Sequence, residues 1–234
     1  GTPNNKLIQM PKIAMIVGRG MGIPDNGEIW HMLDQRFGIP PTLIEFTTLH
    51  SHDLSAYNVI ILANGSPTEP LSPQALPKLK EWVENGGTLI TTGSAYKLTN
   101  KAKITDFKTL SQGKKKDKAE GNAHIEYQPY HNTAKSKSGI EGVIFNCHLD
   151  ITSPLGYGYE NPNVAIKKNG TTVMDFSQIK GSSPMQYTKQ PYLSGCVSLE
   201  NIKRISNAPA SIVSGCGKGN VIWFADDLNY RSYW

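Results

Sequence analysis

The sequence predicts an α/β fold with three layers, an open and mostly parallel sheet that carries helices on both faces. The first observation is that four short apolar runs alternate with stretches of helical spacing over the first 95 residues. The second is that the run at 12–17 is a short apolar segment ending at Gly18, which is typical of a buried parallel strand. Because helices that connect parallel strands cover both faces of a sheet, the alternation indicates consecutive βαβ units.

The predicted strands are 12–17, 42–46, 59–63 and 88–92. A helix is predicted after the first of them, because Asp25 stands three residues before Glu28, the spacing of an N-terminal capping box. Its apolar stripe consists of Ile29, Trp30, Leu33 and Phe37. Gly38 ends this helix. A second helix, before the fourth strand, has a stripe made of Leu76, Leu79, Trp82 and Val83.

The C-terminal half adds β-structure. A strand is predicted at 142–149, and Asn169-Gly170 is a strong hairpin turn between 163–168 and 171–176. A second hairpin is predicted from 210–215 and 220–225. We expect these hairpins to extend the same sheet. Since no linker divides the chain, residues 1–234 are predicted to form a single domain, with a tail at 1–11 and a basic, mobile insertion at 97–139.

The net charge of +5 comes from one segment of the chain. Between residues 97 and 118, eight lysines stand against two aspartates, a local net charge of +6. The rest of the chain is therefore close to neutral, and a lysine run among Gly, Ser and Gln is typical of a solvated loop. We expect no nucleic-acid partner, and the absence of an 18-residue apolar run predicts no membrane span. The three cysteines form no CxxC pair, which leaves open one disulfide with a free thiol or three thiols.

The loop from Gly18 to Gly22 is the first candidate for a ligand site. It follows the first strand and precedes a helix, where backbone amides can bind a phosphate. However, it lacks both the dinucleotide fingerprint and the phosphate-loop Gly-Lys-Ser/Thr, and Asp25 and Glu28 bring negative charge to the same place. We interpret it as a flexible loop. If a small ligand binds at this edge of the sheet, the positions we expect to contact it are Gly20, Glu28, Asn64 and Ser94. Aromatic contacts are expected from Trp30 or Tyr96.

Candidate metal ligands do not form a recognisable motif. His50-Ser51-His52-Asp53 lacks the further histidine of a His-x-His-x-Asp-His site, and His124, Glu126, His131, Cys147, His148 and Asp150 match no closed zinc spacing. We therefore predict no metal site in this chain.

Ser94 is the most informative position. It follows the fourth strand directly, where a sharp turn into a helix can expose a nucleophile at the carboxyl edge of the sheet. A nucleophilic serine needs a base, yet no histidine follows His148 and the last predicted strand ends in Asp226-Asp227. We favour the interpretation that Ser94 caps the next helix. The alternative is a hydrolase in which His131 or His148 reaches Ser94.

The strand-four turn and the late hairpin resemble the class I glutamine amidotransferase-like fold, a flavodoxin-like arrangement. In active members a cysteine occupies the turn and a His-x-Glu follows the last strand. At these places the chain has Ser94 and Asp226-Asp227. The resemblance therefore implies a relative that has lost the amide-hydrolysing dyad.

A closer resemblance runs through the whole chain, to the C-terminal domain of certain bacterial zinc carboxypeptidases of the carboxypeptidase A type. The similar segments keep their order along the chain and are 12–18, 27–37, 85–90, 142–145, 149–150, 154–159 and 217–227. The chain departs from the family at Ser153, often a histidine there, and it stops at Trp234 where the family continues into another helix.

The resemblance implies a non-catalytic accessory domain that supports or partners a metallopeptidase domain upstream in the same polypeptide. The zinc ligands of that enzyme type, His-x-x-Glu and a distant histidine, are absent here, since His31 is followed at that offset by Asp34 and His50 by Asp53. The zinc is therefore expected in the upstream domain and no cofactor in this chain. Because such enzymes are usually exported, a periplasmic or extracellular location is expected. The alternatives are a Ser94-dependent hydrolase or amidase and a small-ligand or sugar-binding module.

Overall fold

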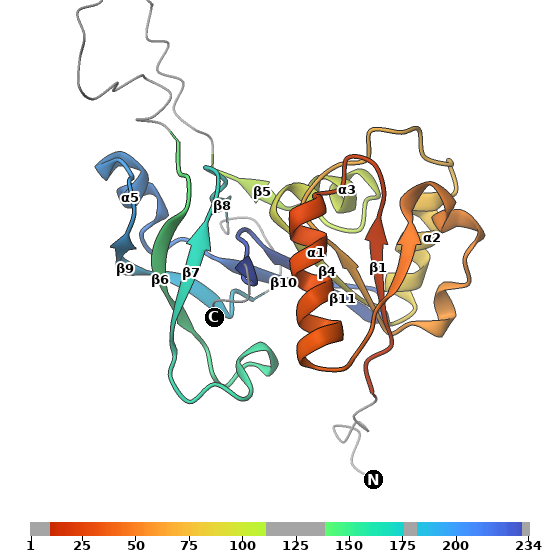
Figure 1. The fold of residues 1–234 in the computed structure, drawn as a ribbon, viewed down its shortest axis with the longest axis horizontal. Helices are drawn as coiled ribbons and strands as arrows, with labels where there is room; N and C mark the ends of the chain where they lie inside the picture. The colour runs from red at the N-terminus through yellow and green to blue at the C-terminus, as the bar shows by residue number, and fades with distance from the viewer. Residues whose placement is uncertain (1–9, 111–138, 176–181, 231–234) are drawn as a thin grey trace, which may run out of the picture.

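The computed structural model describes residues 10–110, 139–175 and 182–230 of the chain. A six-stranded sheet forms its centre (Figure 1). In spatial order its strands are β10 (Ser211–Cys216), β11 (Gly219–Phe224), β4 (Thr88–Thr92), β3 (Val59–Leu62), β1 (Ile13–Val17) and β2 (Thr42–Glu45). All neighbouring pairs are parallel except β10 with β11. The predicted α/β fold class is confirmed, and the hairpin predicted at 210–225 exists and extends the sheet.

The two faces of this sheet are covered by different helices. Alternate residues of a strand point to opposite faces, and in β1 the side chain of Ile16 packs in one core cluster while that of Met15 packs in another. The cluster around Ile16 contains Leu79 of α2 (Ala75–Glu84) and Leu98 of α3 (Tyr96–Lys101). The cluster around Met15 contains Ile29 of α1 (Ile23–His31). The sheet is therefore sandwiched between α1 and the pair α2 and α3.

The helix after β1 changes its pitch before it ends. α1 continues into a π-helical turn at Met32–Arg36, in which the Phe37 backbone N–H donates to the Met32 carbonyl oxygen. A π-helical turn holds more residues than an α-helical turn, so side chains beyond it rotate away from the α-helical stripe. Phe37 is 63% exposed as a result. The prediction that Phe37 belongs to the buried stripe is wrong.

The rest of the C-terminal half forms a separate antiparallel sheet. Its strand order is β7 (Asn163–Lys168), β6 (Val143–Leu149) and β9 (Met185–Ser194), and α5 (Leu199–Ile205) packs beside it. The strand predicted at 142–149 is confirmed as β6. The expectation that all of the added β-structure extends the main sheet is wrong, because this sheet has its own core around Phe145 and Tyr187.

The prediction of a hairpin around Asn169-Gly170 is also wrong. β7 pairs with β6, whereas β8 (Met174–Asp175) pairs with β5 (Lys108–Thr109). The turn is tied to the segment before β6 instead, since the Gly170 N–H donates to the Ile140 carbonyl and the Asn169 side chain accepts from the Gly142 N–H.

The start of the predicted basic insertion belongs to the fold. β5 and all of α3 except its first residue lie within 97–110, and the side chains of Leu98 and Phe107 are buried in the main core. The lysine-rich stretch at 111–138 lies outside the described residues, so the predicted mobility of that part stays a prediction. Within the described ranges, no helix is long and apolar enough to cross a lipid bilayer.

Candidate functional site

The loops that follow β1 and β3 are joined by backbone hydrogen bonds. The Gly22 N–H donates to the Asn64 carbonyl at 2.7 Å, and the Ser66 N–H donates to the Gly20 carbonyl at 3.0 Å. Gly20 has φ +88°, and a Cβ atom there would lie 2.2 Å from the Ser66 carbonyl oxygen. The sequence predicted a free and flexible loop between residues 18 and 22, but these contacts hold it against the next loop.

This junction occupies the place where open α/β sheets commonly bind ligands. The chain moves from β1 to β2 on one side and from β3 to β4 on the other, so the order reverses between β1 and β3. Such a switch point leaves a crevice at the carboxyl edge of the strands. Here the paired loops border the crevice, and the Gly22 N–H is bonded to the Asn64 carbonyl, so this amide is not available to an anion.

Ser94 uses its hydroxyl group to hold the same loop. Its Oγ and its backbone N–H both donate to Oδ1 of Asn64, each at 2.9 Å, and the Gly65 N–H donates to Ser94 Oγ at 3.2 Å. The N-cap of α3 is Ala95, with no side-chain cap. The prediction that Ser94 caps this helix is therefore wrong. The residue links the turn after β4 to the turn after β3.

The position after β11 carries a buried ion pair. Asp226 is 3% exposed, and its Oδ1 accepts a hydrogen bond from Lys168 Nζ at 2.7 Å. The hydroxyl of Tyr187 donates to the other carboxylate oxygen. Lys168 also donates to the Thr172 carbonyl at 2.7 Å and to the Tyr187 hydroxyl oxygen at 3.2 Å. Sequence reasoning missed this triad, although two consecutive lysines at the end of an apolar strand signal that one ammonium group needs a buried partner.

The surroundings of the triad shift the pKa values of two further groups. Burial, and then the charge of Asp226, raise the pKa of the Tyr187 hydroxyl well above its usual value. Burial likewise raises the pKa of the Cys147 thiol, with Asp226 adding to the effect and Lys168 opposing it. Both groups stay protonated at neutral pH, so neither supplies a nucleophile here.

A polar cavity of about 310 Å³ lies at the carboxyl edge, beside these groups. Its lining includes Asp25, Glu28, Asn64, Ser94, Asp226 and Asp227. The connection that follows β7 adds Asn169 and Thr172 from the second region. Of the expected ligand contacts, the structure brings Glu28, Asn64 and Ser94 together here, whereas Gly20, Trp30 and Tyr96 are not among the lining residues.

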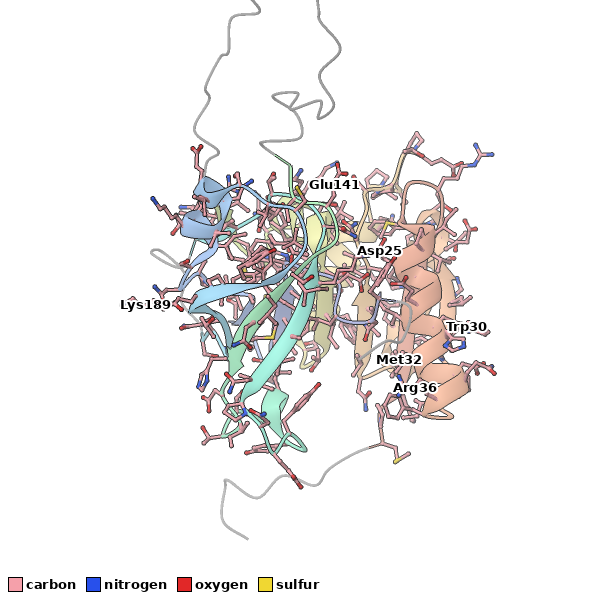
Figure 2. The ribbon with its side chains drawn as sticks, turned by 60° about the vertical axis from the view of Figure 1, so that its left-hand side comes forward. Asp25, Trp30, Met32, Arg36, Glu141 and Lys189 are labelled. Carbon is pink, nitrogen blue, oxygen red and sulfur yellow. The ribbon has the colours of Figure 1, made fainter. Side chains whose placement is uncertain are left out.

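Asp25 and Asp227 form an acidic pair in this cavity. Burial raises the pKa of Asp25, and the nearby charge of Asp227 raises it further, while hydrogen bonds from its own backbone and from Asn64 oppose the shift. Figure 2 shows Asp25 on the side of α1 that faces the second sheet, whereas Trp30 lies on the solvent side. The cavity thus combines carboxylate, amide and hydroxyl groups that suit a small polar ligand.

The described residues bring no histidine to Ser94. His148 lies on β6, exposed and paired with Asn163 and Gln186, and it does not line the cavity. His131, the other base considered, lies outside the described residues. Ser94 Oγ therefore has Asn64 and Gly65 as its partners in the part of the chain that the structure describes.

Of the candidate metal ligands, His124, Glu126 and His131 lie outside the described residues, and the histidines at 50 and 52 have other partners. His50 and His52 contact Thr47 and Thr48, and Asp53 caps the short helix Leu54–Ala56. Over residues 10–110, 139–175 and 182–230, no group of three or more His, Cys, Asp or Glu side chains could hold a metal ion. The three cysteines are unpaired, which removes the disulfide alternative.

Comparisons with known proteins find similarity only at the level of structure. No protein-family model and no curated protein matches the chain. A ThuA-like protein from Parabacteroides merdae matches with a TM-score of 0.58 and 11% identity, over 95% of this chain and 84% of that protein. PurLQS from Thermotoga maritima matches with a TM-score of 0.55 and 14% identity, over 92% of this chain and 86% of the other.

Larger proteins also contain this fold. A β-galactosidase from Bacillus circulans sp. alkalophilus matches with a TM-score of 0.52 and 14% identity, and the chain spans only 28% of its length. At these identities the similarity concerns the fold alone, and none of these proteins links the chain to a carboxypeptidase. The chain has the flavodoxin-like α/β fold shared by ThuA-like proteins and class I glutamine amidotransferases, as the sequence predicted.

Proposed function

We propose that the chain is a non-catalytic accessory domain of a zinc carboxypeptidase of the carboxypeptidase A type. It supports or partners a metallopeptidase domain that precedes it in the same polypeptide. The zinc is bound by that upstream domain, and the parent enzyme is exported to the periplasm or outside the cell. The ordered set of similar segments along the chain supports this assignment.

The use of Ser94 is the observation that carries the non-catalytic part of the proposal. At the turn where an active amidotransferase presents its nucleophile, the Ser94 hydroxyl donates to Asn64 and accepts from Gly65. After the last parallel strand, the Asp226 carboxylate is bonded to Lys168 and Tyr187. Ser94 and Asp226, which stand at the two positions of the lost dyad, thus both make hydrogen bonds within the fold.

The experiment compares the full-length parent enzyme with a version lacking residues 10–230 of this chain. We expect the truncated enzyme to express less, to melt at a lower temperature, or to lose several-fold in peptidase activity. The full-length Ser94→Ala variant is the control, and its peptidase activity should equal that of the parent. Equal expression, melting and activity in the truncated enzyme would contradict the accessory role.

The carboxyl-edge cavity favours a second candidate, a module that binds a small polyhydroxylated ligand such as a sugar. Its volume and its polar lining are the supporting observations. A ligand that binds only the folded state raises stability by about 2.7 kcal/mol at a concentration of 100 Kd. In a thermal-shift screen of free sugars, at least one sugar should therefore raise the melting temperature of the protein. That shift should vanish in Glu28→Gln, and a shift that survives the substitution would place binding elsewhere.

A further inference from the structure

A second hollow, separate from the carboxyl-edge cavity, lies between α2, α3 and the loop that joins β3 to α2. Its volume is about 690 Å³. Leu71, Leu76 and Ala102 form its floor, and all three are partly buried side chains packed on the main core. Leu98 lies beneath them, 5% exposed. We call this hollow the basic groove, because lysines of α2, α3 and the turn after α3 surround it.

The walls of the basic groove are rich in proline. Pro67, Pro70 and Pro73 line it from the loop after β3, and Pro77 lines it from α2. Proline fixes its own backbone angle φ, so the free loop already has little conformational freedom to lose when a partner binds. A surface that is already ordered loses less entropy on binding. These walls therefore suit a site that exists before its ligand arrives.

The rim of the basic groove carries more positive charge than its neighbours neutralise. Lys97, Lys101 and Lys103 are exposed, and none of them has an ion-pair partner within the described ranges. The one carboxylate in the lining, Glu69, faces Arg19 at 3.4 Å. Lys80 of α2 also reaches the rim and pairs with Glu84 at 3.5 Å. The groove thus presents three unneutralised ammonium groups beside an apolar floor.

Lys103 occupies a backbone conformation that lysine disfavours. It follows α3 with φ +55°, in the left-handed region where glycine usually ends a helix. The Lys103 N–H donates to the Asn100 carbonyl and the Ile104 N–H donates to the Thr99 carbonyl, which fixes this conformation. A residue with a Cβ atom is less favourable there than glycine. The fold thus holds a lysine at the rim where a glycine would be more stable.

We infer that the basic groove binds an acidic peptide segment that also carries apolar side chains. Its apolar side chains contact Leu71, Leu76 and Ala102, and its carboxylates meet the lysines of the rim. A ligand with a single carboxylate, such as a fatty acid, would neutralise one of these lysines. Because the unpaired lysines lie on two turns of α3 and just beyond it, several carboxylates spaced along one chain match them better. This inference does not depend on the proposed accessory function.

The test uses a fluorescent nonapeptide of three Glu-Glu-Leu repeats and measures its binding by fluorescence anisotropy. We expect saturable binding that weakens at least ten-fold between 50 mM and 500 mM NaCl, because exposed charges are screened by salt. A matched peptide with Gln in place of Glu and another with Ser in place of Leu should each bind at least ten-fold more weakly.

Three variants locate the site. The double variant Lys97→Glu and Lys101→Glu should lose at least ten-fold in affinity, whereas Lys189→Glu, on β9 of the other sheet (Figure 2), should bind as the parent does. Lys103→Gly should bind about three-fold more weakly while its melting temperature stays the same or rises, because the left-handed position then holds glycine. If Lys103 had only a structural role, this variant would not combine weaker peptide binding with an unchanged or higher melting temperature.

Several outcomes overturn the inference. These are no peptide binding up to 1 mM, equal binding of the Gln peptide, or equal loss of affinity in Lys189→Glu. Lysine-dependent binding of laurate in place of the peptide would also overturn it, since the occupant would then be a fatty acid. If the double variant is unfolded by circular dichroism, the comparison rests on Lys103→Gly and on the three peptides.

Discussion

The parallel half of this molecule and its antiparallel half are held in different ways. In the parallel half, the loops after β1 and β3 are joined mainly through their backbones, with Gly20 allowing the close approach. The antiparallel half meets the main sheet through backbone bridges too, such as Ser182 with Val213. Beyond the end of β11 it adds a buried side-chain junction, in which Lys168 and Tyr187 both contact Asp226.

This difference decides which substitutions the two halves tolerate. A backbone junction accepts most side-chain changes but fails where a Cβ atom must enter a space reserved for glycine. A buried ion pair fails when either partner is removed, because the remaining charge stays in a nonpolar environment. The loop junction at Gly20 and the buried ion pair should therefore respond to different kinds of mutation.

The largest expected effect is in the side-chain junction. Lys168→Met removes the ammonium group that Asp226 contacts and should lower the free energy of unfolding by about 3–5 kcal/mol, measured by urea denaturation. Replacing the whole triad by Lys168→Met, Asp226→Leu and Tyr187→Phe should recover much of this loss, since no charge then stays buried. A loss below about 1 kcal/mol for Lys168→Met would mean that the ion pair does not hold the halves together.

The backbone junction is tested by Gly20→Ala. The new Cβ atom would meet the Ser66 carbonyl at 2.2 Å, and φ is +88°, so we expect a loss of about 2–3 kcal/mol in the free energy of unfolding. Gly27→Ala is the matched control, because it lies within α1 and a Cβ atom there meets nothing within 4 Å. The free energy of unfolding of the Gly27→Ala control should rise by about 0.5–1 kcal/mol. Equal effects at the two glycines would contradict the tight junction between the loops.

Ser94→Ala removes a side-chain link between the turns after β3 and β4. The variant loses the hydrogen bond to Asn64 Oδ1 and the one accepted from the Gly65 N–H, and its unfolding free energy should fall by about 1 kcal/mol. Thermal or chemical denaturation measures this loss. A variant as stable as the parent would mean that the hydroxyl is free for another role.

The smallest effect concerns Asp25, whose pKa is raised by burial and by Asp227. The folded protein binds this proton more tightly than the unfolded chain, so the contribution to stability is complete below the unfolded-chain pKa of about 3.9 and is lost as the pH rises through the folded pKa. At pH 7, Asp25→Asn should therefore be more stable than the parent by up to about 1 kcal/mol, because solvent screens a half-buried group.

Carboxyl titration by NMR checks the same point directly. The pKa of Asp25 should lie above the unfolded-chain value and should fall in Asp227→Asn, and the stability gain of Asp25→Asn should disappear near pH 4. An Asp25 pKa that does not respond to Asp227→Asn would show that burial alone shifts it.

The parallel half was readable from the sequence because its signals are local. The run at 12–17 predicts β1 correctly, since a strand buried on both faces is apolar along its length. The segment at 88–92 predicts β4 correctly as well, and its burial alternates along the strand. The glycines at 217 and 219 likewise mark the turn between β10 and β11.

The junctions were not readable, because they join residues far apart in the sequence. Ser94 contacts Asn64, 30 residues earlier, and Lys168 contacts Asp226, 58 residues later. No short-range spacing of residues in the sequence predicts such pairs. The strong turn signal at Asn169-Gly170 gave a wrong hairpin prediction for the same reason. The turn itself is local, but β7 and β8 each pair with a strand elsewhere in the sequence.

Ser94, at the amidotransferase-like turn, serves as a structural contact rather than as a nucleophile. Treating the folded protein with a fluorophosphonate probe and mapping adducts by mass spectrometry tests it most directly, with the Ser94→Ala variant as the blank. We expect no adduct on Ser94 at neutral pH, because no histidine lies beside its hydroxyl within the described residues, and its hydrogen bonds are made with Asn64 and Gly65. A stoichiometric adduct on Ser94, absent from the variant, would contradict it.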